Sequence, residues 1–161
     1  MSNYKFENFI DRDFPVYSSI QSGTGQIVNP HYHDEAELIL MLSGNADVYI
    51  DTVKFECKQN DLIFIPSYCV HHLISNSSDT SIIGVVFNYK LINNNYIFDA
   101  SLERILNKEH ISKFVFDFYS PINSFLSKSI RDINSYYREN PLKNPLIYAE
   151  IIKICYFLIY S

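Results

Sequence analysis

The sequence predicts a mainly β domain with α-helices after it: a sandwich or barrel of short strands, followed by an antiparallel pair of helices. Between residues 14 and 88, apolar and polar residues alternate in short runs separated by turn-forming residues, as in half-buried strands. Many short strands at close spacing are typical of a sandwich or barrel. After residue 89 the apolar residues recur every three or four positions, which is the spacing of a helix face.

Each strand is assigned from this alternation. Val53, Phe55 and Cys57 alternate with charged residues, and the run 47–51 precedes them across a hairpin turn at Asp51–Thr52. Further short runs cover 36–42, 62–65, 71–75 and 82–87. Turn-forming residues at 43–45, 59–61 and 77–79 separate these runs, so each of these three segments is predicted to end a strand.

Three helices are predicted after residue 89. Ser101 can cap a short one, Ser120–Pro121 begins a longer one, and Asn144–Pro145 begins the last. The predicted buried faces of the two long helices are Ile122, Phe125, Leu126, Ile130 and Ile133, then Ile147, Ile151, Ile152, Cys155 and Ile159. The last helix is apolar on nearly all sides, so it must be covered on more than one side. Either a homodimer forms through the helices at about 121–160, or more chain follows residue 161.

Composition limits the class of protein. The 161 residues suit one domain, 47% of them are hydrophobic, and the formal net charge is −5. The chain has no basic stripe for nucleic acid phosphates. Its three cysteines form no C-x-x-C pair, which favours reduced thiols and a cytoplasmic location. The most apolar run, 146–160, is too short to cross a membrane.

One stretch carries the chemistry: Gly25-x5-His31-x-His33-x3-Glu37-x6-Gly44. On a single strand, residues 31, 33 and 37 would share one face. A second stretch, Asn60-x5-Pro66-x-Tyr68-x2-His71, would bring a third imidazole from another strand. Three imidazoles and a carboxylate suit a divalent ion such as Zn, Fe, Mn, Ni or Co. The alternative is that these side chains hydrogen-bond one another or an organic ligand, and we expect little bound metal.

The first stretch resembles the first motif of the cupin superfamily at both glycines, both histidines and the glutamate. The second resembles the second cupin motif at Pro66 and His71, and departs from it at Asn60 and Tyr68, where the family has Gly, and at Ser75, where it has Asn. The resemblance implies a double-stranded β-helix barrel over 14–89, after an N-terminal arm at 1–13 and before a helical region at 90–161. It also implies the metal ligands His31, His33, Glu37 and His71. A tyrosine at a glycine position implies a different turn.

The degraded second motif is similar to those of the sensory domains of AraC-type transcription regulators, as are the segments 31–44 and 60–72. This resemblance implies a ligand-sensing and dimerisation domain that binds a small molecule, such as a sugar or related metabolite, inside the barrel. DNA would then be bound by a further domain beyond residue 161. We place Tyr32, Tyr49 and Tyr68 beside the His/Glu set as candidate ligand-binding residues.

The alternative function is a metal-dependent cupin enzyme, a dioxygenase or isomerase, that uses the same four side chains. Glu35 is the one further candidate acid or base. A fold alone does not choose between these functions. The two long helices favour the regulator, because a minimal enzyme has little use for them.

Overall fold

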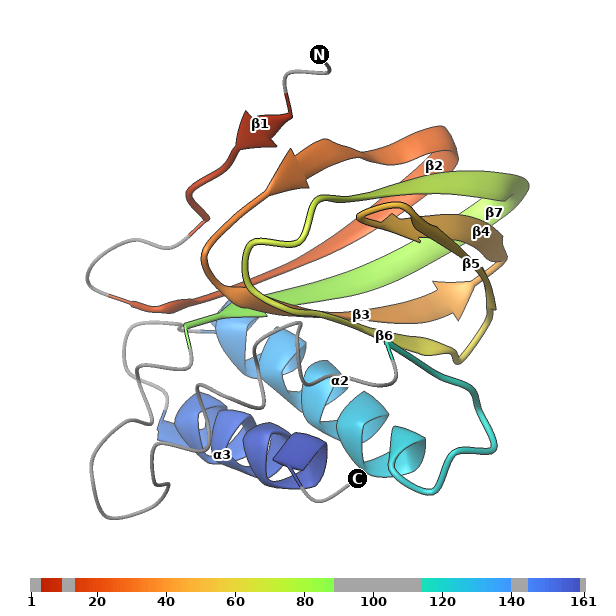
Figure 1. Cartoon of the computed structure of the whole chain (residues 1–161). Helices are drawn as coiled ribbons and strands as arrows, with labels where there is room; N and C mark the ends of the chain where they lie inside the picture. The colour runs from red at the N-terminus through yellow and green to blue at the C-terminus, as the bar shows by residue number, and fades with distance from the viewer. Residues whose placement is uncertain (1–3, 10–13, 89–113, 140–144, 160–161) are drawn as a thin grey trace.

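The computed structural model describes residues 4–9, 14–88, 114–139 and 145–159, which form a β-barrel with two helices packed beneath it (Figure 1). The strands are β1 (Lys5–Phe6), β2 (Val16–Tyr32), β3 (Ala36–Ser43), β4 (Asn45–Ile50), β5 (Val53–Lys58), β6 (Leu62–Ile65), β7 (His71–Phe87) and β8 (Val115–Phe116), and the helices are α2 (Asn123–Glu139) and α3 (Pro145–Ile159). The predicted mainly β fold with a C-terminal antiparallel helix pair is confirmed. The short helix predicted at Ser101 lies outside the described residues.

The two longest strands organise the barrel. β2 and β7 each have 17 residues and pair antiparallel, from Val16 opposite Phe87 at one end to His31 opposite His71 at the other. On its other edge, the second half of β7 pairs with β3 and its first half pairs with β4. Because each half of β7 joins different neighbours, the curled strands close around one interior (Figure 1).

The prediction that residues 77–79 end a strand is wrong. β7 continues through them as a bulge, and its register with β2 jumps from Thr80 to Ser75. Polar side chains hold this bulge: Ser75 Oγ donates to Thr80 Oγ1 at 2.8 Å, and Thr80 Oγ1 donates to Asn45 O at 2.9 Å. Turn-forming residues here stabilise an irregular strand rather than interrupt it.

Alternate residues of β3 divide the core in two. Leu38 and Leu40 face the helices, whereas Ile39 and Met41 face the barrel interior, and all four side chains are buried. α2 packs against β2, β3, β6 and β7, and α3 packs antiparallel to α2 (Figure 1). The helix residues buried against the sheet include Leu126, Ile130, Ile133, Ile147, Ile151, Ile154 and Cys155. No described helix is long and apolar enough to cross a membrane.

Three details of the helices differ from the prediction. α2 begins at Asn123 rather than Pro121, because Asn123 N donates to Ser120 O in a preceding turn and its side-chain amide donates to Phe116 O and Asn60 O. Phe125 is 55% exposed instead of buried. In α3, Ile154 takes the buried place that was predicted for Ile152.

The turn before β7 also corrects an expectation. Tyr68 replaces a glycine of the cupin pattern and was expected to change the turn, yet its φ is 61°, in the left-handed region that glycine favours. Asn60 replaces another glycine with φ 71°. The backbone therefore keeps the glycine conformation, and the strain falls on Tyr68, since asparagine tolerates this region better than an aromatic residue does.

We predict that Tyr68→Gly raises the free energy of unfolding by about 0.5–1 kcal/mol, because relief of left-handed strain exceeds the entropy that glycine adds to the unfolded chain. The side chain is 63% exposed, so little packing is lost. Asn60→Gly is the matched control and should gain less. Urea unfolding measures both variants, and a Tyr68→Gly protein that is less stable than the parent would contradict this account.

Candidate metal centre

Four side chains meet at the end of the barrel where β2 finishes and β7 begins. One ligand atom from each of His31, His33, Glu37 and His71 lies within 4.8 Å of the other three. His31 and His71 meet because they are register partners of β2 and β7. Glu37 reaches the same interior from β3, the other neighbour of β7.

His31, His33 and Glu37 reach one site, but they do not lie on one continuous strand. β2 ends at Tyr32 and β3 begins at Ala36, so His33 lies in the turn between them. A backbone hydrogen bond from Tyr68 N to His33 O, 2.8 Å long, fixes this turn to the loop before β7. The strained Tyr68 thus holds the backbone of His33 close to the strand that carries His71.

All three imidazoles use Nδ1 in the same way. The Nδ1 atoms lie within hydrogen-bond distance of backbone carbonyl oxygens: His31 with Asn29 O (2.8 Å), His33 with Glu35 O (3.0 Å) and His71 with Cys69 O (2.9 Å). A carbonyl oxygen only accepts, so each Nδ1 carries the proton, and a neutral ring keeps its lone pair on Nε2. This tautomer is the one that a backbone carbonyl imposes on metal-binding histidines.

The carboxylate of Glu37 lies between two of the rings. Its Oε2 is 3.3 Å from His33 Nε2 and 3.0 Å from His71 Nε2. Burial alone would raise the pKa of Glu37, but its contacts with His33 and His71 outweigh burial and hold that pKa well below the usual range. The carboxylate is therefore ionised, and it attracts positive charge to this point.

The pKa values of His33 and His31 shift in opposite directions. Burial opposes a charge on His33, but Glu37 outweighs burial and raises the pKa of His33. Burial and then the neighbouring His71 lower the pKa of His31. His31 stays neutral, and its buried Nε2 has no hydrogen-bond partner among the described residues.

A proton on His33 gives the Glu37 carboxylate a positive partner but leaves the His31 Nε2 lone pair without one. A bound cation would give a partner to all three Nε2 atoms and to the carboxylate. An unpartnered buried acceptor is costly, and the Nε2 lone pairs and the carboxylate repel one another when nothing positive lies between them. The four side chains could therefore hold a metal ion, and three imidazoles with one carboxylate suit borderline transition metals.

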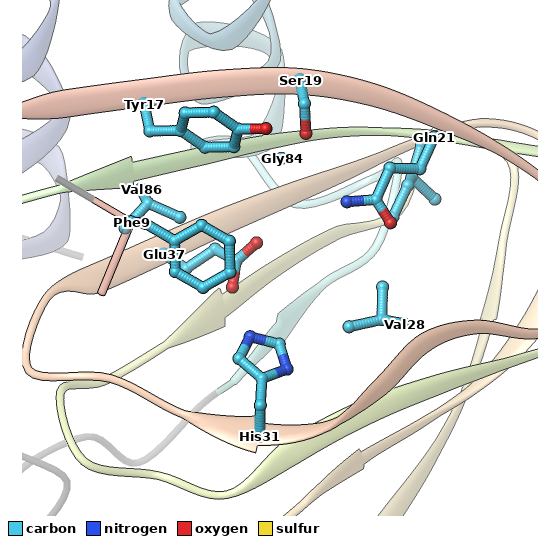
Figure 2. Close-up of a pocket in the computed structure, with 10 residues that line it drawn as sticks. Phe9, Tyr17, Ser19, Gln21, Val28, His31, Glu37, Gly84 and Val86 are labelled. Carbon is cyan, nitrogen blue, oxygen red and sulfur yellow. The ribbon is translucent and has the colours of Figure 1, made fainter. Parts of the chain in front are cut away.

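A small cavity with about 20 Å³ of room for water-sized molecules opens beside His31 and Glu37 (Figure 2). Its wall is formed by Phe9, Tyr17, Ser19, Gln21, Val28, His31, Glu37, Ile82, Gly84 and Val86. The ring of Phe9 lies 5.4 Å from each of the His31 and His33 rings. Gly84 leaves room for the carboxylate, since a Cβ there would lie 3.1 Å from Glu37 Oε1 and Glu37 would have to shift by a few tenths of an ångström.

Tyr32, Tyr49 and Tyr68 are not among the residues that line this cavity. Tyr32 lies between His31 and His33 and packs on Phe6, and Tyr49 stacks on His72 at 4.4 Å. Strand alternation explains this, because each of these two tyrosines neighbours residues that face inward. Tyr68 is mostly exposed.

The cavity residues that the sequence analysis missed are mainly on the first half of β2. Tyr17, Ser19 and Gln21 alternate along the strand, which is a period-two signal, but serines and glycines around them hid it. Phe9 belongs to the arm before the barrel, where no pattern marks it as part of a site. Its place follows from β1, which pairs parallel with the end of β2 at His31 and Tyr32.

The family comparison agrees with this geometry. Residues 17–87 match the family model Cupin_2, described as a cupin domain. Residues 17–87 therefore resemble a cupin domain, and their barrel is of the cupin type. The match spans the segment from β2 to β7, which includes all four residues of the His/Glu cluster.

A curated relative from Aquifex aeolicus (strain VF5), described as an uncharacterized protein, is 35% identical over 60 residues. The alignment covers 37% of this chain and 49% of the relative, so the chain spans about half the length of that relative.

Solved structures are similar to parts of the chain. An RmlC-like cupin from Shewanella frigidimarina is 14% identical, covering 52% of this chain and 73% of that one, with a TM-score of 0.43. The plu4264 protein of Photorhabdus luminescens is 25% identical, covering 48% and 67%, with a TM-score of 0.44. A variant of oxalate decarboxylase from B. subtilis is 20% identical, covering 67% and 35%, with a TM-score of 0.43.

We predict that His31→Ala weakens binding of Co²⁺ or Zn²⁺ by at least about 10- to 100-fold. That is the loss typical when a residue that only hydrogen-bonds to a metal ligand is removed, and His31 would be a ligand itself. Calorimetric titration of chelator-treated protein measures the affinity. His72→Ala is the matched control, because His72 lies beside His71 on β7 and its ring stacks on Tyr49 instead of joining the cluster. Equal losses in both variants would show that the metal binds elsewhere.

Proposed function

We propose that this cupin domain is a ligand-sensing module of an AraC-type transcription regulator. It holds a divalent transition ion (Zn, Fe, Mn, Ni or Co) through His31, His33, Glu37 and His71, and it binds a small molecule in the adjoining cavity. The observation that carries the sensing role is a direct contact between the cavity wall and helix α2. The low metal content expected from the sequence is revised, because the neutral His31 with its unpartnered Nε2 favours an ion.

The contact with α2 is made by two consecutive residues of β2 that face opposite ways. Tyr17 lines the cavity, and its ring lies 5.6 Å from Phe9 and 6.0 Å from Tyr137 of α2. On the other face of the strand, Ser18 Oγ accepts a 2.8 Å hydrogen bond from Asn134 Nδ2 of α2. Ser18 and Asn134 are both buried, with 7% and 6% exposed.

Through this arrangement, a ligand bound in the cavity can change the position of helix α2. A molecule that displaces Phe9 or Tyr17 must alter the contact with Tyr137, since packed interiors respond to small shifts. The buried Ser18–Asn134 hydrogen bond then ties α2 to the same strand, and breaking it would leave polar groups unpaired. Differential contacts of this kind are what ligand-dependent switching needs.

The helices and the turn before α2 also offer a surface for dimerisation. Phe118, Tyr119, Phe125 and Tyr156 are 57%, 85%, 55% and 52% exposed. Phe125 of α2 stacks on Phe157 of α3 at 4.8 Å, so the exposed rings continue across both helices. A second copy of the chain that packs on this surface would carry a change in α2 across a dimer. DNA contacts in such a regulator belong to a separate domain.

The metal-dependent enzyme remains the second candidate, because the cavity opens directly on Glu37 and His31. Beyond these two residues, the polar groups of its wall are the Tyr17 and Ser19 hydroxyls and the Gln21 amide, with no further carboxylate, imidazole or amine among the described residues of the wall. Glu35 is buried behind His33, with Oε2 3.8 Å from His33 Nδ1, and it does not line the cavity. The site therefore favours binding over proton-transfer chemistry.

A metabolite screen against the metal-loaded protein tests the proposed function. Compounds that raise the melting temperature are then followed by hydrogen exchange and by NMR of the compound itself. We predict slower or faster exchange in residues 123–139 of α2, with the compound recovered unchanged. Asn134→Ala should reduce the exchange response while binding persists. Conversion of the compound would favour the enzyme, and binding without any response in α2 would contradict sensing.

We predict that the wild-type chain is a dimer at micromolar concentration and that Phe125→Glu with Tyr156→Glu makes it monomeric, because buried carboxylates would then face each other. Light scattering measures the mass. Val53→Glu is the control, since Val53 is an equally exposed apolar residue, 51%, in the β4–β5 hairpin. Ile151 is unsuitable for this test, because it is only 1% exposed and its substitution would disrupt the core. A monomeric wild type would refute dimerisation.

A further inference from the structure

The side chain of Phe9 fills the space beside the His/Glu cluster that a ligand would need. Its ring lies 5.4 Å from the His31 ring, 5.4 Å from the His33 ring and 5.6 Å from the Tyr17 ring. With Phe9 in place, the cavity has only about 20 Å³ of room, which suits one or two water molecules. A larger molecule therefore reaches the cluster only when a residue of the wall moves.

Phe9 is the wall residue that moves at the least cost. The other described residues of the wall lie in β2, β3 and β7, the strands that build the barrel. Phe9 lies in the arm, which is held nearby by the two-residue strand β1 and by a 3.0 Å hydrogen bond from Glu7 N to Tyr32 O. Both residues of β1 are exposed. Release of the arm therefore breaks few contacts and leaves the barrel intact.

The space that Phe9 occupies, which we call the Phe9 seat, is bounded by three flat rings. The His33 ring stands nearly perpendicular to the Phe9 ring, at 85°, and the His31 and Tyr17 rings are tilted from it by 56° and 40°. Aromatic rings attract one another in edge-to-face and tilted arrangements of this kind, beyond the effect of burying their area. The seat therefore favours an aromatic ring over a saturated group of the same size.

We propose that the Phe9 seat binds a small molecule with one aromatic ring, and that Phe9 is the intramolecular competitor of this ligand. The ring of the ligand replaces the ring of Phe9, and the arm is released. Ser19 and Gln21, on the opposite side of the cavity from His31 (Figure 2), then face a polar substituent of the ligand. This inference rests on the proposed small-molecule binding and names the ligand class of the same cavity.

Benzyl alcohol and cyclohexylmethanol test the proposal, because they share a hydroxymethyl group and a six-membered ring, and only the first ring is aromatic. NMR titration of the wild-type protein gives a dissociation constant for each alcohol. We expect benzyl alcohol to bind about three- to tenfold more tightly, the value of one aromatic pair. Hydrogen exchange in residues 5–9 should become faster when benzyl alcohol binds, because the arm is released.

Variants of Phe9 test the competition. Phe9→Ala should bind benzyl alcohol about tenfold or more tightly than the wild type does, because no buried phenyl ring has to be displaced first. Hydrogen exchange in its arm should no longer respond to the alcohol. Phe9→Leu keeps an apolar side chain in the seat and should gain less affinity.

Phe55→Ala is the matched control for the loss of a phenylalanine ring. Phe55 is also partly buried, but its ring packs on Phe114 at another part of the barrel and does not line the cavity. This variant should leave the affinity for benzyl alcohol unchanged. An equal gain in Phe55→Ala and Phe9→Ala would show that the alcohol fills any vacancy left by a phenylalanine, which would overturn the proposal.

The remaining outcomes separate this inference from the proposed function. Equal affinities for the two alcohols, or no gain in Phe9→Ala, would overturn the aromatic seat. Binding of benzyl alcohol without faster exchange in residues 5–9 would overturn the role of Phe9 as competitor. Release of the arm without any response in α2 would contradict sensing and leave the seat in place. A metabolite without an aromatic ring that binds the cavity and alters α2 would support sensing and contradict this inference.

Discussion

The antiparallel pairing of β2 with β7 is the constraint on which the rest of the structure depends. It places His31 opposite His71 at one end and Val16 opposite Phe87 at the other. At the first end the pairing creates the His/Glu cluster, and at the second end it brings β2 to the helices that cover β3 and β7. The cavity lies between, lined by residues of both strands. One long pairing thus sets the distance between the candidate metal centre and helix α2.

Within the cluster, backbone carbonyls decide the chemistry. Each carbonyl fixes an Nδ1 proton, so the three Nε2 lone pairs stay free, and those of His33 and His71 lie beside the Glu37 carboxylate. The cost of gathering lone pairs and a negative charge in a buried place is met by a proton on His33 or, more completely, by a divalent ion. The loop before β7 contributes through Tyr68, whose strained backbone bonds His33 O. Strain of this kind persists where the surrounding structure compels it, and it often marks functional sites.

The sequence predicted the barrel, the two long helices and the four residues of the cluster, because each has a short-range pattern. Alternation marked β4 and β5, short apolar runs marked β3 and β6, and apolar spacing marked α2 and α3. The spacing of His31, His33, Glu37 and His71 marked the cluster. It could not predict the cavity wall, since Ser19 and Gln21 are polar residues on an interior face, where the alternation of apolar residues is absent. The contact of Phe9 with His31 and His33 depends on the path of the arm, which leaves no periodic signal. The sequence predicted a changed turn at Tyr68, but the fold imposes the glycine conformation on this residue although tyrosine disfavours it.

The central claim is that His31, His33, Glu37 and His71 together hold one metal ion. X-ray absorption spectroscopy of protein loaded with one equivalent of Zn²⁺ or Co²⁺ tests it most directly, because imidazole rings give a distinct outer scattering pattern. The account predicts three imidazoles and only nitrogen or oxygen ligands at about 2.0–2.2 Å. A spectrum with one imidazole or none, or with a sulfur ligand from a cysteine, would contradict it.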